Sequence, residues 1–121
     1  MATVLIVDDS PTERYSATRI LEKYGYEVDF TPDGESSLEK ALEIMPDLIL
    51  MDVVMPGMNG FQATRALSKN PDTAHIPIVI VTTKDQETDK VWGLRQGARD
   101  YVVKPVKEND LISRVQAILG E

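Results

Sequence analysis

The stretch Leu48–Gly60, LILMDVVMPGMNG, decides the fold of this chain. Its first four residues, Leu48–Met51, are all apolar, which is typical of a strand buried on both faces of a parallel sheet. The apolar run ends at Asp52, and Gly57 and Gly60 mark turns close behind it. The stretch therefore predicts a central strand with a carboxylate at its carboxyl end.

Other short apolar runs along the chain predict the remaining strands. Most of them are rich in β-branched residues or almost continuously apolar, whereas Glu27–Phe30 is more polar and predicts an edge strand. The runs are Val4–Val7, Glu27–Phe30, Ile78–Val81 and Tyr101–Val103.

Helical patterns fill the intervals between these runs. The first begins at Ser10–Pro11, an N-cap residue followed by proline at the first helical position, and stops at Gly25. The others cover about 34–45, 60–69 and 87–96, and the last begins at about 108. This alternation of strand and helix predicts an α/β, doubly wound (βα)5 fold, in which helices cover both faces of a five-stranded parallel sheet.

The apolar pattern of the fourth helix allows two orientations of its tryptophan. Val91, Leu94 and Ala98 form an apolar stripe, and Trp92 lies beside the stripe rather than on it. Trp92 either covers the edge of the core or serves as an exposed anchor for a partner, and the spacing leaves both positions open.

The composition is that of one globular domain. The chain has 121 residues and a formal net charge of −7, so we expect a single domain over 1–121 without an output domain. The acidic balance makes direct binding of nucleic acid unfavourable. There is no cysteine, no signal-peptide pattern and no apolar run long enough to span a membrane, and a cytoplasmic monomer is expected.

Polar side chains that are capable of chemistry lie at the ends of the predicted strands. The first strand ends in Asp8–Asp9, the third in Asp52, the fourth in Thr82–Thr83 and the fifth in Lys104–Pro105. The carboxyl ends of parallel strands meet at one edge of the sheet, where ligands bind in folds of this kind. Carboxylates, hydroxyls and one ammonium are therefore expected to converge there.

These groups suit phosphoryl transfer. Mg²⁺ prefers hard oxygen ligands, and it relieves the repulsion between clustered carboxylates. A carboxylate can attack phosphorus to form an acyl phosphate, while cations and a hydroxyl stabilise the charge on the transferring oxygens. Each strand end taken alone could be a helix start or a turn, but their coincidence favours a functional site.

Four stretches of the chain together resemble the receiver domains of two-component signalling. They are Leu5–Ser10, Leu50–Gly60, Ile80–Thr83 and Gly97–Pro105. The segment Thr82–Gly93 is similar to that of PilH-type stand-alone regulators of type IV pilus twitching motility. The resemblance implies a CheY-like response regulator with the flavodoxin-like strand order 2-1-3-4-5.

The resemblance also implies a metal site and a phosphoacceptor. Asp52 would accept the phosphoryl group. Asp9, Asp52 and the backbone carbonyl of Val54 would bind Mg²⁺ directly, and Asp8 would act through a metal-bound water. No other cofactor is implied. In receivers the residue two beyond the acceptor often holds the water that hydrolyses the acyl phosphate, and here that residue is Val54, whose side chain forms no hydrogen bond.

Further roles follow from the same resemblance. Lys104 would pair with the phosphoryl oxygens, and the Lys104–Pro105 bond resembles the family's cis peptide. Thr82 would be the switch hydroxyl, coupled to the rotamer of Tyr101, although an aromatic residue on a strand is usually a packing residue.

The function implied is that of a stand-alone response regulator in chemotaxis-like control of pilus motility. A CheA-like histidine kinase or a phosphotransfer domain would phosphorylate it, and an output protein would bind the face made by the fourth helix, fifth strand and fifth helix. Such a receiver catalyses its own phosphorylation and dephosphorylation but is not a turnover enzyme.

Two other functions fit the same fold plan. A flavin-binding electron carrier needs a Ser/Thr/Gly-rich phosphate loop after the first strand, whereas Asp8–Pro11 here would repel a phosphate without a metal. A small Mg²⁺-dependent aspartyl phosphatase needs a substrate pocket or cap, for which the predicted elements leave little chain.

Overall fold

The computed structural model describes all 121 residues and confirms the predicted alternation of strands and helices. The strands are β1 (Thr3–Val7), β2 (Glu27–Thr31), β3 (Leu48–Met51), β4 (Ile78–Thr82) and β5 (Asp100–Val103). The helices are α1 (Pro11–Lys23), α2 (Ser37–Ile44), α3 (Gly60–Lys69), α4 (Glu87–Arg95) and α5 (Glu108–Leu119).

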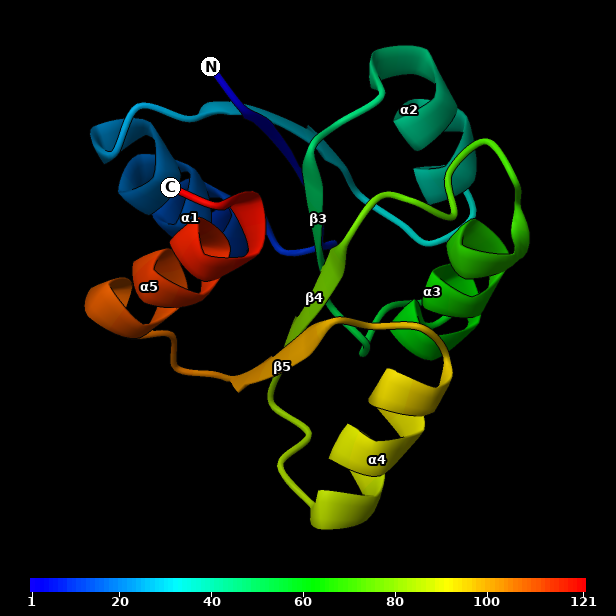
Figure 1. Cartoon of the computed structure of the whole chain (residues 1–121). Coiled ribbons are helices and arrows are strands. Elements are labelled where there is room, and N and C mark those ends of the chain that lie inside the picture. The colour runs from blue at the N-terminus through cyan, green and yellow to red at the C-terminus, as the bar shows by residue number, and fades with distance from the viewer.

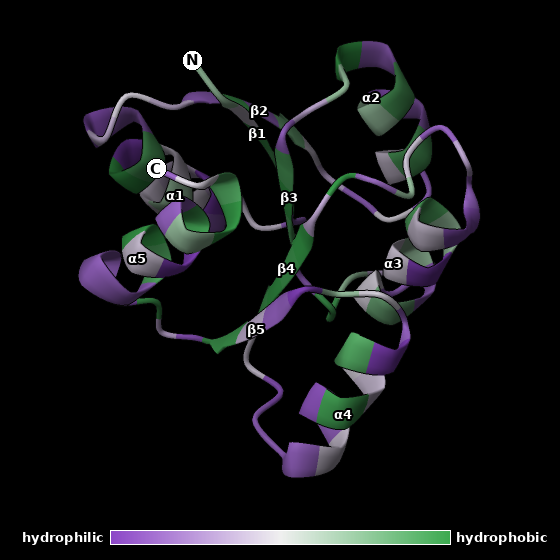
Figure 2. Ribbon diagram, in the orientation of Figure 1, coloured by the Kyte–Doolittle hydropathy of each residue, from purple (hydrophilic) through white to green (hydrophobic).

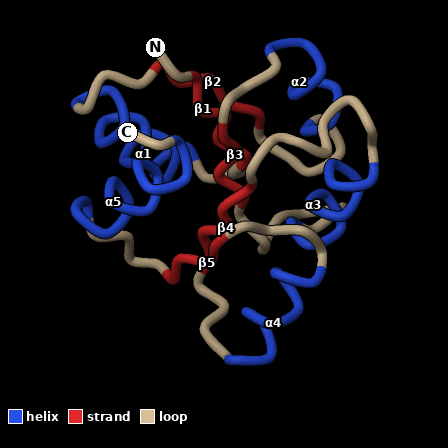
Figure 3. Tube along the Cα trace, viewed as in Figure 1, coloured by secondary structure: helices blue, strands red, loops and turns tan.

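All the strands are parallel and lie in the order β2-β1-β3-β4-β5, so the predicted doubly wound fold and its strand order are confirmed. Helices α1 and α5 cover one face of the sheet, and α2, α3 and α4 cover the other (Figures 1 and 3). The polar strand β2 lies at an edge, as its sequence predicts. None of the helices combines the length and apolar character that crossing a bilayer requires.

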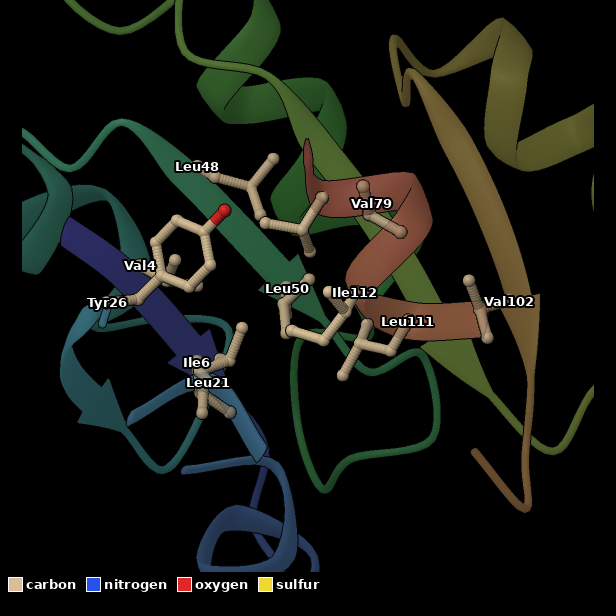
Figure 4. Close-up of a cluster of buried hydrophobic side chains, with 11 residues drawn as sticks. Val4, Ile6, Leu21, Tyr26, Leu48, Leu50, Val79, Val102, Leu111 and Ile112 are labelled. Carbon is tan, nitrogen blue, oxygen red and sulfur yellow. The ribbon is translucent and has the colours of Figure 1, made fainter. Parts of the chain in front are cut away.

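Each face of the sheet has its own apolar core, because alternate strand residues point to opposite faces. Val4 and Ile6 of β1 pack with α1 and α5, and Leu5 and Val7 pack with the residues under α2 and α3. Figure 4 shows the first of these clusters, in which Leu21 from α1 and the α5 residues meet the strands. The central strands are the most hydrophobic part of the ribbon in Figure 2.

Local hydrogen bonds set the starts of α1 and α2. The Ser10 side chain accepts a hydrogen bond from the Glu13 N–H at 3.3 Å, so Ser10 caps α1 as predicted. Helix α2 begins at Ser37, later than the predicted start near residue 34. The reason is a turn in which the Asp33 carboxylate accepts the Ser36 N–H at 2.8 Å.

Helix α4 does not bury the predicted apolar stripe. Val91 and Leu94 are 44% and 49% exposed, and only Ala98, beyond the end of the helix, is buried. The residue that faces the sheet is Gly93, where a Cβ would lie 2.8 Å from a β4 side chain. Because the helix backbone approaches the sheet through a glycine, its large apolar side chains point outward. Trp92, 50% exposed, is therefore a surface residue and does not cover the core.

We expect Leu21→Ala to lower the free energy of unfolding by about 2–5 kcal/mol, because it removes a fully buried side chain and leaves a cavity in the core. Leu42→Ala is the matched control, since Leu42 is also helical but is 41% exposed. Urea denaturation of both variants measures the difference. Equal losses in the two variants would contradict the assignment of Leu21 to the core.

Candidate phosphoryl-transfer site

The predicted residues meet at the carboxyl edge of the sheet. Asp8 and Asp9 follow β1, Asp52 follows β3, and one carboxylate oxygen from each lies within 4.8 Å of the others. Asp8 and Asp52 are only 6% and 8% exposed, whereas Asp9 is exposed. The Asp52 N–H donates to the Val7 carbonyl at 2.9 Å, so the sheet's own hydrogen bonding places this carboxylate beside the first strand.

Lys104, directly after β5, supplies the cation of the site. Its Nζ lies 3.0 Å from Asp8 Oδ2 and 3.5 Å from Asp52 Oδ2. A further carboxylate, that of Glu13 on α1, lies 3.7 Å from the same Nζ. Negative charge therefore exceeds positive charge at this edge, and the excess sits in a partly buried position.

The imbalance shifts the acidity of the site. Burial raises the pKa of the Asp52 carboxyl; the Lys104 ammonium opposes the rise and the Asp8 carboxylate adds to it. Burial by itself lowers the pKa of Lys104, but its hydrogen bond to Asp8 and the charge of Asp52 outweigh burial and raise that pKa above its ordinary value. Lys104 is therefore charged at neutral pH, and ionisation of the Asp52 carboxyl costs free energy in the folded state.

Thr82 and Tyr101 are both linked to one residue of the β4–α4 loop. The buried Thr82 Oγ1 accepts the Lys84 N–H at 3.4 Å, and the Tyr101 hydroxyl donates to the Lys84 carbonyl at 2.8 Å. Burial raises the pKa of Tyr101 to about 12, so its hydroxyl remains a donor at neutral pH. Tyr101 also packs in a small apolar cluster, so it is a packing residue as well as a hydrogen-bonding one. Thr83 is exposed.

The structure places the remaining residues around this edge. The Lys104–Pro105 peptide bond is cis. Val54 is 58% exposed in the loop that follows β3. A cavity of about 250 Å³ opens between the sheet, α1 and the start of α5, and Asp8, Glu13 and Lys104 line its polar end.

Sequence reasoning missed Glu13, Arg14 and Glu35. The Arg14 guanidinium donates to the Asp8 carbonyl oxygen at 2.9 Å and lies 4.4 Å from the ring centroid of Phe30. The position of Glu13 and Arg14 in the first turn of a helix that starts beside Asp9 could have indicated both. The Glu35 carboxylate accepts a hydrogen bond from the Met58 N–H. No local signal indicates Glu35, because Met58 is 23 residues away in sequence.

Residues 4–116 match the response regulator receiver domain family. The chain belongs to this family. The receiver is 58% identical over 120 residues to Protein PilH of Pseudomonas aeruginosa, and the match covers 99% of each protein.

Solved structures of other receivers agree with this fold. The receiver matches the chemotaxis protein CheY4 of Vibrio cholerae with a TM-score of 0.92 and 36% identity, over 98% of this chain and 99% of that one. It matches the receiver domain of the sensor histidine kinase PA1611 of Pseudomonas aeruginosa with a TM-score of 0.90 and 29% identity, over 99% and 98% of the two chains. That PA1611 structure has a magnesium ion coordinated in its active-site cleft.

We expect Asp52→Asn to raise the melting temperature of the receiver in EDTA at pH 7, because it removes a buried carboxylate whose pKa is raised in the folded state. A carboxyl whose pKa is raised in the folded state destabilises the fold once it ionises. The rise in melting temperature of Asp52→Asn over the wild type is therefore complete above the folded pKa of Asp52. The gain shrinks as pH falls toward the ordinary value of 3.8, where the unfolded chain is also protonated.

Asp72→Asn, which removes the same charge from an exposed position, is the control. Thermal melts of the three proteins between pH 4 and 7 measure the effect; at this size a change of 1 kcal/mol moves the midpoint by roughly 4 °C. A lower melting temperature for Asp52→Asn at pH 7 would show that the ionised carboxylate stabilises the fold.

Proposed function

We propose that this receiver accepts a phosphoryl group on Asp52 from a histidine kinase or a phosphotransfer domain, and that it signals through a phosphorylation-dependent change of shape. The observation that carries the proposal is the cluster of Asp8, Asp9 and Asp52 at the carboxyl edge of the sheet, with Lys104 close to Asp8 and Asp52. Membership of the receiver family supports it, because phosphorylation signalling is the family's role.

The proposed reaction is an in-line transfer. A carboxylate oxygen of Asp52 attacks phosphorus, the new O–P bond forms, and the N–P bond to the donor's imidazole breaks, after which the imidazole takes up a proton. Lys104, 3.5 Å from Asp52 Oδ2, pairs with a phosphoryl oxygen as negative charge develops there. The side chain of Lys104 is only 10% exposed, so little water screens this pairing.

The carboxylate cluster fits a Mg²⁺ ion. Its donors are hard oxygens that lie close together, and Lys104 alone does not balance their charge. The carbonyl oxygen of Val54 accepts no hydrogen bond from the protein, so it is free to act as a ligand. We assign direct binding to Asp9, Asp52 and that carbonyl, and assign Asp8 a water-mediated contact. When bound, Mg²⁺ offsets the charge of the carboxylates and of the phosphoryl oxygens. The magnesium ion in the related PA1611 receiver supports this assignment.

The signal would leave the site through Thr82 and Tyr101. The Thr82 hydroxyl gains a hydrogen bond to the phosphoryl group only in the phosphorylated state, and phosphorylation thereby shifts the population between two conformations. Tyr101 is coupled to this change because the Thr82 and Tyr101 side chains both contact Lys84. The output protein would bind the face made by α4, β5 and α5.

The PilH resemblance supports a more specific role. Identity of 58% over nearly the whole of both chains favours a stand-alone regulator in the control of type IV pilus motility. We propose that it acts as a monomer in the cytoplasm. A CheA-like kinase is the expected phosphodonor. The receiver family match and the acidic loop after β1 favour this role over a flavin carrier or a phosphatase that turns over substrates.

Acetyl phosphate with Mg²⁺ should add one base-labile phosphoryl group to the wild type, detected by intact-protein mass spectrometry, and none to Asp52→Asn. Asp72→Asn should label like the wild type, because it removes an equal charge outside the site. Labelling of Asp52→Asn at the wild-type rate would refute the assignment of Asp52. If Asp52 is confirmed, phosphotransfer from purified histidine kinases identifies the donor.

The phosphorylated state should be long-lived. Val54 and Lys84 line one shallow groove in the loops that follow β3 and β4. The Val54 side chain can neither donate nor accept a hydrogen bond to a hydrolytic water, and the Lys84 ammonium would pair with a phosphoryl oxygen and hinder the approach of that water. Val54→Asn with Lys84→Glu introduces groups that can hold such a water, and it should speed dephosphorylation by about 10-fold, less than the 10²–10⁴-fold of a fully positioned base. The measurement is the decay of purified phosphoprotein. An unchanged or slower decay in the double variant would show that the rate is set elsewhere.

A further inference from the structure

The loop between β3 and α3 carries two of the proposed Mg²⁺ ligands, the Asp52 carboxylate and the Val54 carbonyl. Contacts between the loop's own residues hold its two ends together. The Gly60 N–H donates to the Val53 carbonyl at 3.0 Å, and a Cβ at Gly60 would collide with the Asp52 carbonyl oxygen. The Asp52 carboxylate also accepts the Val53 N–H at 2.8 Å. These contacts hold the start and the end of the loop but not its outer part.

In the outer part of this loop, the Met55 side chain is buried in the core under α2 and α3, and Met58 packs against that core. The backbone there is held by a hydrogen bond from a different segment. The carboxylate of Glu35, in the turn between β2 and α2, accepts the Met58 N–H at 2.7 Å. This is the only hydrogen bond that joins residues 55–58 to the rest of the fold. Helices α2 and α3, which the two segments lead into, lie next to each other on the same face of the sheet (Figure 1).

Two glycines allow the segments to approach closely. A Cβ at Gly34 would lie 2.7 Å from the Met58 carbonyl oxygen. A Cβ at Gly57 would lie 2.7 Å and 2.8 Å from the two oxygens of the Glu35 carboxylate, and Gly57 has a left-handed φ of +73°. A side chain at either glycine would push the segments apart, so the Glu35 contact depends on a close approach that only glycine permits.

The segment that carries Glu35 is itself anchored near the site. The Ser36 N–H donates to the Asp33 carboxylate at 2.8 Å, and the Ser36 and Thr31 hydroxyls are hydrogen bonded. The Thr31 carbonyl accepts the Asp8 N–H at 3.3 Å. A chain of hydrogen bonds thus runs from the backbone of Asp8 to the base of the turn that carries Glu35. Glu35 then contacts the loop that carries Asp52.

An exposed glutamate is usually a solvated surface charge, and Glu35 is exposed. Its short, charge-assisted contact with a backbone N–H and the glycine packed against its carboxylate distinguish it from that case. Because the contact is solvent-accessible it contributes little to global stability, and its effect is concentrated on the loop.

We propose that Glu35 is a positioning residue for the Mg²⁺ and phosphoryl site. By holding the Met58 N–H it restrains the outer part of the β3–α3 loop and so fixes where the Val54 carbonyl points. The inference rests on the proposed function, because it concerns the placing of a proposed metal ligand. Glu35 itself touches none of the reacting atoms.

The test separates the hydrogen bond from the charge. Glu35→Gln removes the charge but keeps an acceptor at the same reach, whereas Glu35→Asp keeps the charge and withdraws the acceptor. Glu35→Ala removes both. Glu39→Gln, at an exposed α2 position without a hydrogen bond or ion pair, controls for the loss of one negative charge.

Isothermal titration of each purified protein with MgCl2 gives the Mg²⁺ Kd. We expect Glu35→Ala and Glu35→Asp to weaken Mg²⁺ binding by roughly 10-fold, the lower end of the range for removing a partner that orients metal ligands. Glu35→Gln and Glu39→Gln should stay close to the wild type. Melting temperatures in EDTA should differ little among the variants, and acetyl phosphate labelling of Glu35→Asp should need more Mg²⁺ to reach half its maximal rate.

Two results would overturn the inference while the proposed function stands. One is a wild-type Kd for Glu35→Asp. The other is a weakening in Glu35→Gln as large as in Glu35→Ala, which would show that a hydrogen-bond acceptor at this position is not enough. A wild type that neither binds Mg²⁺ nor labels on Asp52 would instead remove the proposed function, and this inference with it.

Discussion

Lys104 is one ammonium group among several carboxylates, and the organisation of the sheet's carboxyl edge depends on that imbalance. It lies within 3.7 Å of oxygens from Asp8, Asp52 and Glu13. A partly buried site with excess negative charge is unfavourable, and burial raises the pKa of Asp52 accordingly. The same excess makes the site receptive to a divalent cation and, with that cation, to a phosphoryl group. The feature that costs stability in the metal-free receiver is thus the feature that supports its proposed chemistry.

The scaffold tolerates this cost because the rest of the sheet is apolar and rigid. Strands β1 and β3 are buried on both faces, with separate cores toward α1 and α5 and toward α2 and α3. Parallel hydrogen bonding continues to the point where each strand ends, so the backbone of Asp52 is placed by the Val7 carbonyl of the neighbouring strand. The charged groups therefore occupy one edge, where the loops and not the cores absorb their repulsion.

Helix α4 buries no large apolar side chain. Its only buried residue is Gly93, and its large apolar side chains face outward. The loop that leads into it is linked to both Thr82 and Tyr101 through Lys84. A helix with few buried apolar contacts shifts at low cost, so this part of the fold is suited to respond to a change near Asp52.

From the sequence alone, the fold class, the sheet order through the family resemblance, and the meeting of Asp8, Asp9, Asp52 and Lys104 could be predicted. The reason is that strand periodicity is local and that parallel strands must end at a common edge. Tertiary structure decided what depends on contacts between distant segments. It turned Val91 and Leu94 outward, since Gly93 rather than the apolar stripe meets the sheet. It placed Glu13 on Lys104, more than 90 residues apart in sequence, and Glu35 on Met58. Periodicity shows which side chains share a face of one element. It carries no information about which backbone approaches which side chain across the fold. The packing of distant segments therefore determined these partners.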